Sequence, residues 1–201
     1  MTDLDRRETL KLLSLAPLLA MGLPAHAAEA ASDHAARALG AAGDAIYAPK
    51  FFTASEFSSV RILSDLVIPR DDRSGGATDA GVPEFMDFIM TEYPSSQKWM
   101  REGLAWLDTD SRRRTRKSFV ASTNAQRTAI LDDIAFPRKA AAELKDGAAF
   151  FSRFRDLTSS GFWSSRIGVR DLQYIGNRPI AAWNGCSPAA LRRLGVSYKK
   201  A

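Results

Sequence analysis

Histidine, cysteine and nucleotide-binding motifs are scarce or absent in this sequence. Of the two histidines in the 201-residue chain, His26 lies near the N-terminus and His34 in a polar stretch, so we expect none in the folded body. Cys186 is the only cysteine, which excludes a disulfide within the chain, a Cys/His zinc cluster and a Cys-X-X-Cys-His haem site. Neither a Gly-X-Gly-X-X-Gly segment nor a P-loop occurs. We therefore expect no cofactor, no metal and no catalytic residue in this chain.

A long apolar run is also missing. The apolar segment from Leu12 to Leu23 spans 12 residues and is interrupted by Pro17 and Gly22. A membrane-spanning helix needs about 20 apolar residues, so this segment is too short to be one. A basic stretch precedes it, and the small residues of 25–28 (Ala-His-Ala-Ala) follow it, which is the layout of a secretory signal.

The basic stretch resembles a twin-arginine export signal, with Arg6 and Arg7 as the pair and Leu10 and Lys11 behind them. This route carries folded cargo, commonly because the cargo holds a cofactor. Residues 1–27 are therefore predicted to be a signal peptide that is cleaved after residue 27 or 28, and the protein is predicted to be periplasmic. A signal that stays uncleaved and acts as a tether is the alternative.

The composition fits a single soluble domain. Hydrophobic residues make up 45% of the chain, and the net charge is +5. A basic exported protein suits an acidic partner or the anionic surface of a membrane. Nucleic acid is not an expected partner in that compartment.

The hydrophobic pattern predicts an all-α fold. Residues 28–50 are rich in Ala, Gly and Asp without strong periodicity, and we expect a linker there. Beyond residue 51, apolar residues recur at helical spacing, after capping boxes at 53–56 and 123–126, and no segment alternates with period two. Residues 51–201 are predicted to form one irregular bundle of about five helices, which start near residues 53, 82, 94, 123 and 146, the last ending at 157.

From about residue 159 an extended tail rich in glycine and aromatic residues is predicted. Such a tail cannot bury much surface against itself, so it must lie on its own bundle or on another chain. Aromatic residues and arginines are enriched in interface hot spots. The tail is therefore predicted to wrap a partner, with contacts from Phe162, Trp163, Arg170, Tyr174, Asn177, Arg178 and Trp183.

Two charged clusters have both a structural and a functional interpretation. The acidic cluster around the stretch 70–81 either caps helices and solvates a loop or forms an acid/base site. Its spacing does not match a calcium-binding loop. The basic run 112–117 is either a solvated helix face or a docking patch for lipid head groups or an acidic partner. The acidic cluster consists of Asp71, Asp72, Asp79, Glu84 and Asp87.

Three segments, taken with the leader, resemble a known family. The first is Phe52-Thr53-X-X-Glu56 followed by residues 68–77 (IPRDDRSGGA). The second is 80–87 (AGVPEFMD), and the third is 161–177, which begins GFWSS and ends DLQYIGN. In this order they resemble the gluconate 2-dehydrogenase subunit 3 family over roughly residues 50–198.

The resemblance implies a non-catalytic small subunit that escorts, exports and stabilises a large subunit. That partner would be an FAD-dependent sugar or glycoside dehydrogenase of the glucose-methanol-choline type, and it would hold the FAD. Residues 178–186 are similar to relatives that pair with glycoside 3-dehydrogenases. Since this chain has no haem motif, a cytochrome c is an expected electron acceptor, and association with the membrane surface is a further expectation.

Two functions of other classes stay open at this point. One is a stand-alone periplasmic hydrolase that uses the acidic cluster, and the other is a sugar-binding module that uses Trp163 and Trp183.

The thiol of Cys186 is either buried or forms a bridge to another chain.

Overall fold

The structure is a computed structural model that describes residues 26–41, 47–174 and 185–198. The described residues contain helices and no strands, which confirms the predicted all-α fold. None of these helices is long and apolar enough to cross a lipid bilayer. The α-helices are α2 (Ala27–Ala41), α3 (Ala54–Val67), α4 (Val82–Glu92), α5 (Gln97–Thr115), α6 (Asn124–Ile134), α7 (Lys145–Ser164), α8 (Arg166–Asp171) and α9 (Pro188–Leu194); η1 (Pro94–Ser96) and η2 (Ala142–Leu144) are 3₁₀ turns.

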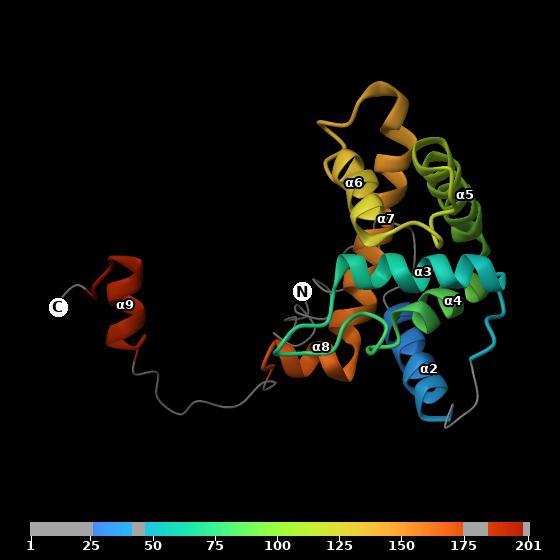
Figure 1. The fold of residues 1–201 in the computed structure, drawn as a ribbon. Helices are drawn as coiled ribbons and strands as arrows, with labels where there is room; N and C mark the ends of the chain where they lie inside the picture. Colours follow the sequence, from blue (N-terminus) through green and yellow to red (C-terminus); the bar gives the residue numbers. More distant parts are fainter. Residues whose placement is uncertain (1–25, 42–46, 175–184, 199–201) are drawn as a thin grey trace, which may run out of the picture.

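Helix α7 forms the centre of the bundle. It contacts α5 and α6 along its first half and α2, α3 and α4 along its second half, and α8 follows at its end (Figure 1). Its inward face carries large side chains that are almost fully buried, among them Phe150, Phe154, Leu157 and Phe162. Removing this much apolar surface from water is the main stabilising contribution in such a bundle.

The sequence signals for helix starts are confirmed at atomic detail. Thr53 accepts the amide of Glu56, and the Glu56 carboxylate accepts the amide of Thr53, so two otherwise unpaired amides are satisfied before α3. Thr123 and Gln126 do the same before α6. Ahead of α4, Gly81 takes a φ of 76°, a left-handed conformation that suits glycine.

The expected linker at residues 28–50 contains a helix, α2, which packs against α4 and α7. Its contact face is built from alanines such as Ala31 and Ala35, which are 0% and 3% exposed. His34 stacks on Phe88 with ring centroids 4.8 Å apart, so the expectation of a histidine-free body is wrong. A search for large apolar side chains at helical spacing overlooks a helix whose buried face is made of small ones.

The predicted fifth helix does not stop at residue 157 but continues to Ser164. Gly161 and Gly168 belong to the tail that the sequence predicts to be extended, yet both lie inside helices at close contacts. A Cβ at position 161 would lie 2.9 Å from the Phe85 ring, and one at 168 would lie 2.1 Å from the carbonyl oxygen of Phe162. Glycine permits this close approach.

Helix α9 buries no residue, and Figure 1 shows it apart from the bundle.

Candidate partner-docking surface

The structure does not gather the acidic cluster into one site. Asp71 closes its own turn by accepting the amides of Arg73 and Ser74, and these hydrogen bonds hold the pKa of its exposed carboxyl below the ordinary value. Asp79 pairs with Arg70 at 2.5 Å, and Asp72 is exposed. Among the described residues no three histidines, cysteines or carboxylates lie close enough to hold a metal ion.

Asp87 has a structural role on α4. Its carboxylate is fully buried and accepts four hydrogen bonds, from the Tyr47 hydroxyl and from the amides of residues 50, 51 and 52, at 2.8 to 3.1 Å. The segment that enters α3 is therefore fastened to α4 through one side chain. Burial and the hydrogen bond to Asp87 raise the pKa of Tyr47. A carboxylate with so many internal partners is not available as a general base.

Glu84 lies three residues earlier, and its environment is different. Its side chain is 3% exposed, and the nearest cation is Arg61 at 3.8 Å, whose own side chain is half exposed. The carboxyl oxygen Oε2 has no hydrogen-bond partner within the described residues. Burial raises the pKa of Glu84. Glu84 lines neither of the two clefts of about 290 and 450 Å³ on the described residues, and its buried side chain leaves almost no surface for a substrate to contact.

Most of the basic run at the end of α5 is paired within the chain. Arg112 contacts Asp108, and both Arg113 and Arg114 contact the buried Asp110 at 2.5 to 2.6 Å. Arg114 also reaches Asp133 of α6 at 2.5 Å. The pair between Arg114 and Asp133 joins α5 to α6, whereas the other pairs lie within α5. Together they neutralise much of the run, which favours the structural interpretation over a lipid-docking patch.

The family-like segments meet where the loop after α3 crosses α8. Arg73 of the loop donates to the carboxylate and the carbonyl of Asp171 at 2.9 and 3.2 Å. Between loop and helix lies an open cleft of about 450 Å³. Residues 98 positions apart in the sequence thus form one surface. The cleft is lined by Arg70, Arg73, Ser74, Gly75, Asp79, Ile167, Arg170, Asp171 and Gln173.

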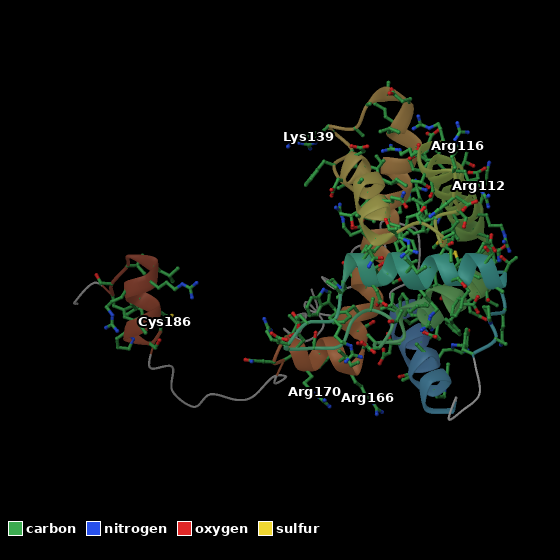
Figure 2. All side chains as sticks on the ribbon, in the orientation of Figure 1. Arg112, Arg116, Lys139, Arg166, Arg170 and Cys186 are labelled. Atoms are coloured by element: carbon green, nitrogen blue, oxygen red, sulfur yellow. The ribbon has the colours of Figure 1, made fainter. Side chains whose placement is uncertain are left out.

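Helix α8 presents cationic and apolar groups next to this cleft. Arg166 and Arg170 are exposed, and their guanidinium groups have no hydrogen bond or ion pair within the described residues; Figure 2 shows both pointing away from the bundle. Val169, Leu172 and Tyr174 are 37%, 58% and 43% exposed. Arginine beside exposed aromatic and aliphatic side chains is typical of protein interfaces. We call the cleft, together with residues 166–174, the α8 surface.

The predicted contact residues fall into three groups. Arg170 and Tyr174 lie exposed on the α8 surface, whereas Phe162 is 1% exposed and belongs to the core. Trp163 is half-buried with its ring edge-on to Phe162, 4.9 Å away, so it is not an open platform for a sugar. Asn177, Arg178 and Trp183 lie outside the described residues, as do Arg6, Arg7, Leu10 and Lys11 of the export signal.

Sequence reasoning missed Val169 and Leu172. The spacing of apolar residues in a helix does not tell whether they face the protein's own core or a partner. That distinction depends on how α8 is oriented against the bundle, which only the structure shows. The ion pair between Arg73 and Asp171 was equally hidden, because nothing in a single sequence links two positions so far apart.

Comparison with known proteins identifies the family but no close relative. The family model described as gluconate 2-dehydrogenase subunit 3 matches residues 54–185, more than half of the chain. A search of curated proteins and a search of solved structures each found no match. The matched range includes the loop after α3 and α8, which build the α8 surface. The chain belongs to the gluconate 2-dehydrogenase subunit 3 family.

Proposed function

We propose that this chain is a non-catalytic small subunit that escorts, exports and stabilises the large subunit of an FAD-dependent sugar or glycoside dehydrogenase. The family is named for a subunit of gluconate 2-dehydrogenase, which implies a large-subunit partner. The large subunit carries the FAD and the reacting residues. The complex is exported by the twin-arginine route, stays in the periplasm near the membrane surface, and passes electrons to a carrier such as a cytochrome c.

The α8 surface is the observation that carries this proposal. It is formed by segments that the family match covers, and it combines exposed apolar side chains with guanidinium groups that have no partner in the part of the chain that the structure describes. An isolated soluble domain gains nothing from this combination, whereas a partner that covers it removes apolar surface from water. We expect acidic residues beside an apolar patch on the large subunit, because they would complement Arg166 and Arg170.

No particular observation favours the two alternative functions. The hydrolase would need a free pair of carboxylates in a cleft. The two carboxylates that line the cleft of the α8 surface, Asp79 and Asp171, are paired with Arg70 and Arg73. Asp87 is saturated with hydrogen bonds, and Glu84 is buried. The sugar-binding module would need exposed aromatic faces, and Trp163 is packed on its neighbour.

Co-expression with a candidate large subunit tests the proposal. The full chain carries an affinity tag, and we expect the gene for its partner, a flavoprotein without an export signal, to lie beside the gene for this chain. We expect a yellow complex with flavin absorbance and dye-linked sugar oxidation in the periplasmic fraction. Without this chain, the flavoprotein should remain in the cytoplasm. If it reaches the periplasm and is equally active alone, the escort function is excluded.

A further inference from the structure

The bond at which cleavage of the leader is expected lies inside a helix. Ala27 and Ala28 form the first turn of α2 and are 0% and 4% exposed. The amide of Ala30 donates to the carbonyl of His26 at 3.1 Å, so the helical hydrogen bonds extend across the bond between residues 27 and 28. This bond is thus buried as well as helical.

Several contacts hold α2 against the bundle. Ala31 and Ala35 continue the buried face one and two turns further on. Ser32 forms a 2.6 Å hydrogen bond with Ser164 at the end of α7, and His34 stacks on Phe88 of α4. Figure 1 shows α2 below α4, at the lower side of the bundle, and the two helices are in contact. Alanines, a hydroxyl pair and an aromatic contact thus fix α2 to two different helices.

A peptidase requires a different conformation of the same residues. Proteases bind an extended, accessible segment on both sides of the bond that they cut, and folded helices are cut only when they open locally. Opening the first turn of α2 would expose Ala27 and Ala28 and break the hydrogen bond to His26. The peptidase therefore cannot bind residues 27 and 28 while α2 is docked on the bundle.

The order of events decides which state the peptidase meets. A chain that crosses the membrane unfolded is cut before any helix can dock. A chain exported in the folded state arrives with α2 already in place. We propose that the docking of α2 protects the bond between Ala27 and Ala28, so that the folded, exported chain keeps its leader. This inference rests on the export step of the proposed function.

A retained leader would have a consequence for location. Its apolar run, Leu12 to Leu23, stays joined to the folded body through α2. An apolar segment held in the lipid interface anchors the domain that follows it. The complex would then remain at the periplasmic face of the membrane without a spanning helix in the described residues.

Variants on the two faces of α2 test the protection. Ala35→Asp places a charge in the core and should undock α2, and the double variant Ser32→Ala/His34→Ala is a milder form of the same change. Ala36→Asp is the matched control, because residue 36 is exposed. After expression with the large subunit, we expect wild type and Ala36→Asp at full-length mass, and the undocked variants to begin at residue 28 or 29. A wild-type chain that begins there would overturn the inference.

An assay with purified chains separates protection from export. Elastase, whose small specificity pocket accepts alanine, is added to each full-length chain, and cleavage between residues 27 and 28 is followed by mass spectrometry. The rate at which a protease cuts a helix that opens transiently is proportional to the fraction of molecules in which the helix is open. Because docking keeps that fraction small, we expect cleavage to be at least ~10-fold slower in wild type and Ala36→Asp than in the undocked variants. Equal cleavage rates in all chains would overturn the inference. This assay does not depend on export, and cell fractionation measures export separately.

Discussion

Glu84 and Asp87 are two buried carboxylates on one helix, and their surroundings differ. Asp87 is buried and saturated with donors, whereas Glu84 is buried with a distant, half-exposed arginine as its nearest cation. Burial of a charge costs free energy unless hydrogen bonds or an opposite charge offset that cost. The carboxylate of Asp87 is therefore expected to stabilise the fold, and that of Glu84 to destabilise it at neutral pH.

The pH dependence follows from the raised pKa of Glu84, which burial causes. A carboxyl group whose pKa is higher in the folded than in the unfolded state stabilises the fold at pH values below its ordinary pKa of 4.5. This stabilising contribution is lost as the pH rises through the folded-state pKa. Glu84→Gln removes the charge, so we expect a gain of about 1 kcal/mol at pH 7 that disappears below pH 4.5.

Asp87→Asn is the matched contrast, because it also exchanges a carboxylate for an amide on α4. The amide group of asparagine would face backbone donors, so we expect a loss of about 3 kcal/mol at pH 7. Urea unfolding at pH 4 and pH 7 measures both variants, with Glu143→Gln on the exposed surface as the neutral control. A stabilising effect of Asp87→Asn, or no effect of Glu84→Gln at pH 7, would contradict this interpretation.

At the scale of elements, the sequence predicted the helices that have a cap and a stripe of large apolar side chains. Thr53 and Thr123 are found at the predicted starts, and Phe57, Val60 and Leu63 are buried on one face of α3. Helix α2 has neither signal, and the continuation of α7 was hidden by glycines that look like breaks in a linear sequence. Whether a glycine ends a helix or makes room for a neighbour depends on a second helix, which local patterns do not reveal.

Gly103 on α5 illustrates the second role. A Cβ at this position would lie 1.8 Å from the ring of Phe150 on α7, so the two helices pack at a distance that only glycine permits. Gly103→Ala should cost about 1–3 kcal/mol by overpacking. Gly40→Ala on α2 is the control, since a Cβ there meets nothing within 4 Å, and helix propensity alone predicts a gain of about 0.5–1 kcal/mol. Urea midpoints that move in the same direction for both variants would contradict the packing argument.

At the scale of the whole molecule, the site was harder to predict than the fold. The sequence identified the residues of the α8 surface as family-like segments, but it could not show that the loop after α3 and α8 meet. It also assigned Phe162 and Trp163 to the interface, although the core takes up the first and much of the second. Residue type alone cannot separate these cases, because aromatic residues serve cores and interfaces equally well.

The α8 surface makes a prediction about the assembled complex. Arg170→Glu reverses a charge that has no partner within the described residues, and Leu172→Asp places a charge on the apolar part of the same surface. Each change should weaken binding of the large subunit by at least ~10-fold while leaving the thermal stability of this chain unchanged, because both side chains are exposed.

Lys139→Glu serves as the matched control, since it also reverses an exposed charge and lies near η2, far from α8 in Figure 2. Titration calorimetry of each purified chain with the flavoprotein gives the affinities. The loss for Arg170→Glu should shrink at high salt, because screening weakens an exposed charge contact, whereas the loss for Leu172→Asp should persist. If all three variants bind like the wild type, the large subunit docks elsewhere on this chain.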